Sequence, residues 1–273
     1  MLRNAFAYIT RKWPKSLLLF AIILLMGTLS LIGLSMKGAT QKASSESLGS
    51  ITNSFSMQIN RRTNPGTPRG AGNLRGEDIE KISQVEGITS SIRRINAIAD
   101  ILDHEIIETE ETLQNQSSER AKYFKNTLMV TGVNDSSKED KFVSGAYKLV
   151  QGEHLTDKDK KQILMHEDLA KKNGLKVGDK VRLKSNLYDA DNEKGANETV
   201  EVTIKGLFSG KNQAPLTYAQ ELYEDTLISD LDTAAKLYGN TVQTATYEDA
   251  TFFAKGDQDL DKLIEKIKAL DIT

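Results

Sequence analysis

The strongest constraint on the fold is a run without any charged residue, SLLLFAIILLMGTLSLIGLSM, from Ser16 to Met36. At about 1.5 Å per residue, about 21 residues of helix cover about 31 Å, which matches the hydrocarbon core of a bilayer. We therefore predict a transmembrane helix over residues 16–36. The alternative is a cleaved signal peptide, but its apolar region would span only about 7–15 residues, and no small-x-small cleavage site follows cleanly.

The residues before this run are basic and place the N-terminus. Four bases precede the apolar run, and Trp13 lies beside it; the bases are Arg3, Arg11, Lys12 and Lys15. This flank predicts a cytoplasmic N-terminus and an extracellular position for the bulk of the chain. Residues 1–15 fit a cytoplasmic amphipathic segment, with apolar residues at helical spacing, and equally fit a merely basic leader.

Composition excludes several classes of protein. The 273 residues are 27% charged and 38% hydrophobic, which is ordinary for a folded chain that buries a core. After the four N-terminal bases, the rest of the chain has 32 of the 36 Lys and Arg against 38 acidic residues. This part is mildly acidic, so we expect no nucleic-acid partner. Cysteine is absent, which excludes disulfides, thiolate zinc sites and a lipoprotein anchor. Many Gram-positive surface proteins likewise lack cysteine.

Outside the predicted span, the sequence reads as a stalk followed by a folded domain. Residues 37–50 are polar and free of proline, so the helix can continue outward as a stalk. Residues 51–60 alternate as a strand. Residues 61–76 hold two prolines, four glycines and four arginines. They predict a long exposed loop, which is either a solvated tip or a site for an anionic partner.

The remaining sequence mixes helical and strand patterns, which predicts an α+β fold. The stretch from His166 to Ser185 reads as the end of a helix, two glycine turns and a strand, with Gly174 as the helix C-cap and Gly178-Asp179 as the tight turn. We expect helices at 77–85, 231–239 and 259–270, strands at 88–102, 124–133, 198–208 and 247–255, and a strand, short helix and strand over 162–185.

No motif in the sequence predicts chemistry. The histidines at 104, 154 and 166 lack metal-ligand spacing, and HEDLA fails as a zinc motif because Ala170 stands where the second histidine would be. Only three residues separate Gly206 from Gly210, too few for a phosphate loop. We therefore predict no catalytic, cofactor-binding or metal residue, and no enzyme activity in this chain.

Three stretches resemble a known family: LVQGEHLT, QILMHEDLAKKNGLKVGDKVRLKS and VEVTIKGLF. Together they are similar to the extracytoplasmic core of MacB-type ABC transporter permeases, which are related to FtsX. The N-terminal run is similar to the first helix of the family, particularly in streptococcal-type permeases. The residues on the family pattern are Gly152, Leu155, Leu169, Ala170, Gly174, Leu175, Val177, Gly178, Asp179, Val181, Ile204 and Gly206.

The resemblance implies an architecture. Residues 51–273 would form a MacB-like core in which 51–135 and 216–273 build a porter-like βαβ subdomain and 136–215 an inserted β-rich part. Asp179 would then form a turn and have no catalytic role. Such permeases carry three more spans after this domain, and the sequence ends at Thr273, so we expect either a truncated chain or the loss of those spans.

The resemblance also implies partners and a role in the cell membrane. The family works as a dimer of permeases, here homo- or heterodimeric, with a separate ATPase subunit that hydrolyses ATP, and it allows an extracytoplasmic accessory protein. The function implied is export of, or defence against, peptides or antimicrobial compounds. The alternative is a single-span surface sensor or binding module without transport activity.

Overall fold

The computed structural model describes residues 14, 24, 26, 54–58, 74–107, 122–211, 223–256 and 259–270. The chain divides into two units, Met1–Asn53 and Ser54–Thr273. Among the described residues, no helix is long and apolar enough to cross a bilayer. The predicted segments at 1–15, 16–36 and 37–50 lie outside the described residues, apart from helical Pro14, Leu24 and Met26.

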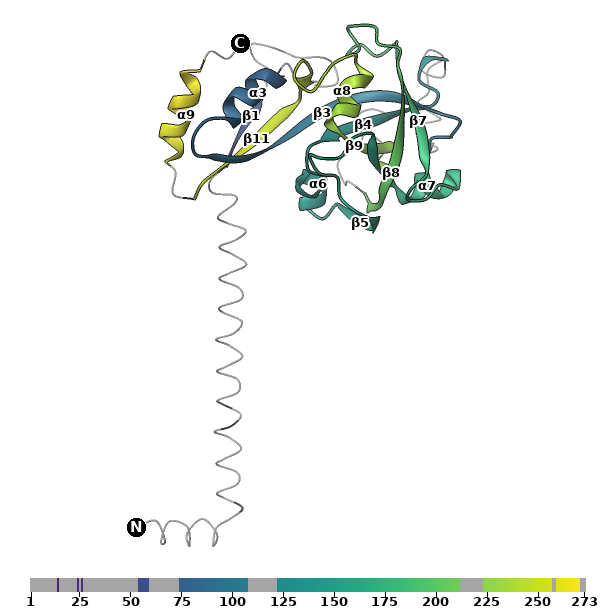
Figure 1. Ribbon diagram of the computed structural model, residues 1–273. Coiled ribbons are helices and arrows are strands. Elements are labelled where there is room, and N and C mark those ends of the chain that lie inside the picture. The colour runs from purple at the N-terminus through teal and green to yellow at the C-terminus, as the bar shows by residue number, and fades with distance from the viewer. Residues whose placement is uncertain are drawn as a thin grey trace, which may run out of the picture. The chain divides into compact units, whose positions relative to one another are not determined.

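The second unit has the mixed α+β character that the sequence predicts (Figure 1). Its helices are α3 (Gly76–Ser83), α6 (Asp140–Val143), α7 (Glu167–Asn173), α8 (Leu231–Leu237) and α9 (Leu260–Lys268). Its strands are β1 (Ser54–Gln58), β2 (Leu74–Arg75), β3 (Ile88–Leu102), β4 (Thr127–Val133), β5 (Tyr147–Gly152), β6 (Gln162–His166), β7 (Lys180–Ser185), β8 (Thr199–Gly210), β9 (Thr226–Asp230), β10 (Thr246–Tyr247) and β11 (Asp249–Ala254). Two 3-10 helices are η1 (Ser136–Lys138) and η3 (Tyr223–Asp225).

Six of these strands close into a barrel. The main sheet runs β1-β11-β3-β4-β9-β6-β8-β5, and β7 bonds both β3 and β8. The ring β3-β4-β9-β6-β8-β7 therefore returns to its first strand, and we call these six strands the barrel. Within it, β4 with β9 and β6 with β8 are parallel pairs. Closure leaves no free edge between the barrel strands, the feature that makes open sheets prone to add further strands.

Strand β3 belongs to two parts of the unit at once. Its first half pairs with β11, its middle pairs with β4 from Arg94 to Asp100, and its last residues pair with β7. The part outside the barrel, made of β1, β2, α3, β10, β11, α9 and residues 88–94, is called here the α/β lobe. Figure 1 shows β3 as one long strand that runs from this lobe into the barrel.

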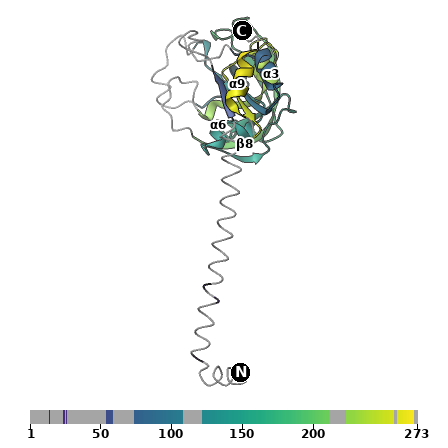
Figure 2. The ribbon, with the colours of Figure 1, turned by 90° about the vertical axis from the view of Figure 1, so that its left-hand side faces the viewer.

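The two helices of the α/β lobe form because their apolar residues fall on one stripe. Ile79 and Ile82 of α3 are buried, as are Leu263 and Ile267 of α9. The side chain of Asp259 caps α9 by accepting hydrogen bonds from the first helical N–H groups. Figure 2 shows α3 and α9 on the same side of the unit.

One hydrophobic cluster runs through both parts. It contains Ile79 and Phe252 of the α/β lobe together with Val181 and Ile204 of the barrel. A second, smaller cluster packs around Phe208, with Val133, Tyr147, Leu155, Leu164 and Ile228. Neighbouring residues of β6 divide between the two clusters, as the period of two in a strand requires. The continuous core joins the lobe and the barrel into one packed body.

The loop predicted at 61–76 is corrected at its end. Leu74 and Arg75 form strand β2, which pairs with β10, and Gly76 begins α3. This strand depends on a partner about 170 residues further along, so local composition could not predict it. The rest of the predicted loop lies outside the described residues. The division into 51–135 with 216–273 and an inserted 136–215 stays a prediction.

Candidate functional site

The stretch from His166 to Ser185 forms a helix, a turn and a strand, as predicted. Gly174 ends α7 in the left-handed conformation, with φ of 65°, and Gly178 has φ of 93°. A carboxylate oxygen of Asp179 accepts the N–H of Lys176 at 2.9 Å, which closes the tight turn before β7. The geometry of Asp179 is that of a turn-forming residue.

The buried histidine of this stretch is fully used by the fold. His166 is 2% exposed, and its Nδ1 accepts the backbone N–H of Asp168 at 3.2 Å as the cap of α7. Its Nε2 therefore carries the proton and donates to the carbonyl of Gly210 at 3.0 Å. The structure gives both ring nitrogens a structural partner, so His166 offers no free nitrogen to a ligand.

The other sequence candidates are not brought together. His104 is half-buried, whereas His154 lies beside Ser136, whose Oγ is 2.9 Å from the His154 Nδ1. Burial lowers the pKa of His154, and the charge of Asp135 opposes this only in part. Gly206 and Gly210 both lie within strand β8. Within the described part of the chain, no group of three or more His, Cys, Asp or Glu side chains could hold a metal ion.

The most concentrated charge interaction lies where the α/β lobe meets the barrel. Arg94 of β3 contacts four carboxylates, two from each side of the junction. Its Nη1 is 3.6 Å from Glu139 and 3.7 Å from Asp140, at the start of α6. Its Nε is 3.7 Å from Glu248, and its Nη2 donates to Asp249 of β11. Arg94 therefore links α6, next to the barrel, to β11 in the lobe.

The charge of Arg94 is stabilised by these neighbours. Burial lowers the pKa of Arg94, but the carboxylates of Asp249 and Glu248 raise it by more, so the net direction is upward. Glu248 is itself held by the carboxamide of Asn96, which donates to it. The Nε of Arg94 is buried and has no hydrogen-bond partner among the described residues, so the ion pairs at Nη1 and Nη2 are what hold the guanidinium between its neighbours.

The adjacent residue, Arg93, faces the other side of β3 and lines a cleft. Its guanidinium pairs with Glu80 of α3 at 3.1 Å. Nearby, burial raises the pKa of the Tyr247 hydroxyl to about 12, and this hydroxyl donates to the carbonyl of Val242 at 2.8 Å. The cleft has a volume of about 720 Å³ and lies between the α/β lobe and the barrel. We call it the junction cleft.

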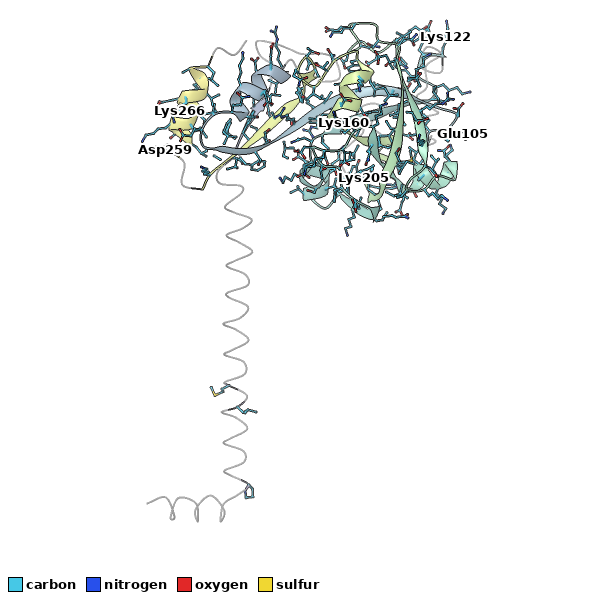
Figure 3. All side chains as sticks on the ribbon, in the orientation of Figure 1. Glu105, Lys122, Lys160, Lys205, Asp259 and Lys266 are labelled. Carbon is cyan, nitrogen blue, oxygen red and sulfur yellow. The ribbon has the colours of Figure 1, made fainter. Side chains whose placement is uncertain are left out.

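The junction cleft is lined mainly by polar side chains. The lobe contributes hydroxyls from α3 and the start of β3, and the loop before β10. The barrel side contributes Asn134, residues 156, 157, 159 and 160, and the start of α8. Among these, Asp159 receives the ammonium of Lys205 at 2.8 and 2.9 Å. Burial raises the pKa of Asp159, but the hydrogen bonds from Lys205 and Thr156 lower it by more. Figure 3 labels Lys160 and Lys205 on this side.

Comparison with known proteins identifies the family. A family model described as the MacB-like periplasmic core domain matches residues 16–270. The chain therefore belongs to this family, the MacB-like domains of ABC-type transporter permeases. Such domains are components of transporters and are not catalytic themselves. The family is the permease part of the transporter, which implies an ATPase partner, and its members are membrane proteins with an extracytoplasmic domain.

Solved structures give a more distant likeness. The periplasmic region of MacB from Actinobacillus actinomycetemcomitans is 17% identical, with 80% of this chain and 82% of that chain covered and a TM-score of 0.46. The extracellular domain of the noncanonic ABC-type transporter YknZ from Gram-positive bacteria is 14% identical, with 77% and 87% covered and a TM-score of 0.41. No curated protein sequence matches.

Sequence reasoning missed the arginines of the junction. The adjacent pair Arg93-Arg94 stands inside the long strand SIRRINAIADIL, where charged residues need partners. That signal was present in the sequence. It could not reveal that the two side chains face opposite sides of the sheet toward different partners, because those partners lie up to 155 residues away.

Proposed function

We propose that this chain is part of the permease subunit of a MacB-type ABC transporter. Its extracytoplasmic domain would couple ATP-driven movement of the membrane helices to export of, or defence against, peptides or antimicrobial compounds. The observation that carries the proposal is the family match over residues 16–270, which includes both the apolar run and the folded unit.

The fold offers a physical route for this coupling. A domain that transmits movement has to resist bending between the place where force enters and the place where it acts. Strand β3 is continuous across the junction, the main hydrophobic cluster spans both parts, and Arg94 adds ion pairs across it. Packed interiors are stiff and transmit strain, so the unit is suited to move as one body.

The proposal includes partners and a topology. A separate ABC ATPase subunit would supply the energy, and a second permease would complete the membrane part, as a homo- or heterodimer. The basic N-terminal flank supports a cytoplasmic N-terminus and an extracellular position for the folded unit in a cell membrane. An extracytoplasmic accessory protein is a further partner that this arrangement accommodates.

We also keep the subdomain division as a proposal. Residues 51–135 and 216–273 would form the porter-like part and 136–215 the inserted β-rich part. The α/β lobe draws its elements from the first set. The barrel uses strands from both sets, because β4 and β9 pair with each other and β9 also pairs with β6. Strand β3 lies wholly in the first set and pairs with β7 of the inserted part, so it joins the two.

Affinity purification of the protein from its native membranes tests the proposal. We expect an ABC ATPase to copurify in near-stoichiometric amount, and its hydrolysis of ATP to depend on the permease. Isolation of the protein without any ATPase, after mild solubilisation that preserves other membrane complexes, would instead support a single-span sensor or binding module. Protease added to intact cells should remove the folded unit, and protection of that unit would contradict the topology.

A further inference from the structure

Residues 136–143, which contain η1 and α6 and are called here the α6 segment, lie beside β5 (Figure 1). A pair of hydrogen bonds holds this segment to residues 153–161, the loop that joins β5 to β6. The backbone N–H of Ser136 donates to the carbonyl of Leu155 at 3.1 Å, and the N–H of Leu155 donates to the Ser136 Oγ at 2.9 Å. Both residues are fully buried, so this contact is shielded from water.

His154 completes the contact through the same hydroxyl group. Its Nδ1 is 2.9 Å from the Ser136 Oγ. The Oγ already accepts the N–H of Leu155, and in the described part of the chain the His154 Nδ1 is the acceptor that remains for the hydroxyl hydrogen. The hydroxyl therefore donates to His154, and the ring is neutral with its own hydrogen on Nε2. The contact as it stands requires this neutral ring.

Protonation of His154 removes the acceptor on which the contact depends. A protonated ring carries a hydrogen on Nδ1, which then faces the Ser136 hydroxyl as a second donor. A buried donor that loses its acceptor is costly. If the ring instead turns away, it leaves Phe142 of α6, whose ring centroid lies 4.9 Å from that of His154. Either response weakens the attachment of the α6 segment to the loop.

The charges around His154 set the pH range of this change. Burial lowers the pKa of His154 from its usual 6.5, and the charge of Asp135 opposes this only in part. The contact is therefore intact above about pH 6.5 and is lost as the pH falls through the lower folded value. The other charged groups on the surrounding elements are Lys138 paired with Asp135, Lys205 paired with Asp159, Glu139 and Asp140 paired with Arg94, Lys141 over the ring of Tyr147, and exposed Glu153.

The α6 segment also carries the barrel side of the Arg94 ion pairs. Glu139 and Asp140 lie 3.6 and 3.7 Å from the Arg94 Nη1, three and four residues after Ser136. Glu139 is buried, and its carboxylate also caps α6 by accepting the N–H of Lys141 at 2.8 Å. Movement of the segment therefore withdraws two of the four carboxylates around Arg94, and leaves it with the two from the lobe.

We propose that His154 is an acid-sensitive switch on the α6 segment: its neutral ring holds the segment against the loop between β5 and β6, and its protonation releases the segment together with the two carboxylates that pair with Arg94. The link between the α/β lobe and the barrel is then weaker in acidic surroundings than at neutral pH. This inference goes beyond the proposed function, because it concerns the folded unit alone and involves no ATPase.

Hydrogen exchange of single backbone amides, measured by NMR on the 273-residue chain in detergent, tests the switch. After correction for the intrinsic exchange rate, the Leu155 amide should lose about threefold to tenfold of its protection between pH 7.5 and 5.5, the effect of one hydrogen bond. It should exchange by local opening, so low denaturant that speeds exchange of the bonded Ile204 amide in the barrel should leave Leu155 unchanged. Equal protection of Leu155 and Ile204, or Leu155 protection that does not fall with pH, overturns the proposal.

Variants separate the switch from a general effect of acid. His154→Gln should make Leu155 protection independent of pH, whereas His104→Gln, at a half-buried histidine outside the segment, should leave the pH dependence unchanged. Ser136→Ala removes the hydroxyl that favours the neutral ring, so the NMR titration midpoint of His154 should rise toward 6.5. Arg94→Met should lower Leu155 protection, because the segment loses its other attachment. Equal behaviour of the two histidine variants, an unmoved His154 midpoint, or unchanged Leu155 protection in Arg94→Met contradicts the switch.

Discussion

The barrel and the α/β lobe share strand β3 but treat their strand edges in opposite ways. In the barrel, six strands close on one another, and His166, Gly174 and Asp179 satisfy the backbone of the helix and turn that join β6 to β7. In the described part of the lobe, β1 lies at the end of the sheet, and residues 88–93 of β3 pair with a strand on one edge only. The difference shows that closure of the barrel satisfies the strand edges of one part, whereas the lobe leaves strand edges of the kind to which further strands can add.

The largest expected effect tests whether the two parts unfold together. Phe252 of β11 is fully buried and stacks on Phe55 at 5.2 Å, and Phe208 of the barrel is equally buried. Replacing either with alanine leaves a cavity that should cost about 4 kcal/mol of unfolding free energy. The larger cluster joins Phe252 to the barrel strands, and Phe208 lies on one of these strands, β8, so each variant should lower the same single transition in circular dichroism and calorimetry. Phe252→Leu, at about 1 kcal/mol, keeps the test usable if the alanine variant does not fold.

Two separate transitions, with Phe252→Ala moving one and Phe208→Ala the other, would break the comparison in a specific way. The lobe would then be an independent domain hinged on β3. If the two parts are coupled, the slowest backbone amides of the lobe should exchange their hydrogens only through global unfolding. Their opening free energy should then equal the free energy of unfolding of the whole unit.

The next effect concerns glycines at the rim of the barrel. Gly152 has φ of 81°, and a Cβ there would meet the carbonyl oxygen of Lys205 at 2.1 Å. Gly178 has φ of 93° but open space around it. Gly178→Ala should cost about 1 kcal/mol from backbone strain alone, and Gly152→Ala about 3 kcal/mol because the clash with a backbone atom adds to it. Chemical denaturation measures the loss of unfolding free energy in both variants. Equal losses would show that the backbone between β5 and β8 shifts to accept the added methyl group at little cost.

A smaller effect is expected at Arg94, the charged link across the junction. Arg94→Met leaves four carboxylates without their cation and should cost about 2 kcal/mol, less than for a fully buried pair because the side chain is 23% exposed. Arg182→Met removes an exposed ion pair with Asp103 and should change the melting temperature little. High salt should narrow the difference between wild type and Arg94→Met only slightly. A loss no larger than that of Arg182→Met would remove Arg94 from the account of the junction.

The smallest effect is a pH dependence that arises beside the barrel. Burial lowers the pKa of His154 below its usual 6.5, so the folded state favours the neutral ring. The unfolded chain binds a proton first, and stability is therefore present above about pH 6.5 and declines as the pH falls through the lower folded value. His154→Gln should remove this decline between pH 7 and 5 in thermal melts. Asp135 and Asp159 have pKa values below their usual 3.8. The stability they contribute is therefore present above pH 3.8 and is lost as the pH falls below it.

The sequence predicted elements whose cause is local. The strand predicted over 88–102 has the bounds of β3, because this stretch is rich in isoleucine and follows Gly87. The helix, Gly174 cap and Gly178-Asp179 turn were predictable for the same reason, since capping and turn chemistry lie within a few residues. The family resemblance, carried by these residues, is confirmed by the match over 16–270.

Features that depend on distant partners were not predictable from the sequence. Barrel closure requires the last residues of β3 to meet β7, about 80 residues later, and nothing in either strand specifies that register. The ion pairs of Arg94 join residues 139, 140, 248 and 249, which only the closed fold brings together. Among the described strands, residues 88–93 of β3 pair on one edge only because the pairing of β4 ends at Arg94, a fact of topology and not of composition.

The central claim is that the α/β lobe and the barrel form one rigid body, and a distance measurement between them tests it most directly. The chain lacks cysteine, so Lys266→Cys on α9 and Lys171→Cys on α7 provide unique spin-label sites, both exposed. Pulsed electron–electron double resonance measures the distance between the two spin labels. The doubly labelled chain should give a single narrow distribution of this distance. Adding ATP and the copurified ATPase should leave that distribution unchanged. Two resolved distances, or a broad distribution that shifts with ATP, would contradict the account and show that the junction is a hinge.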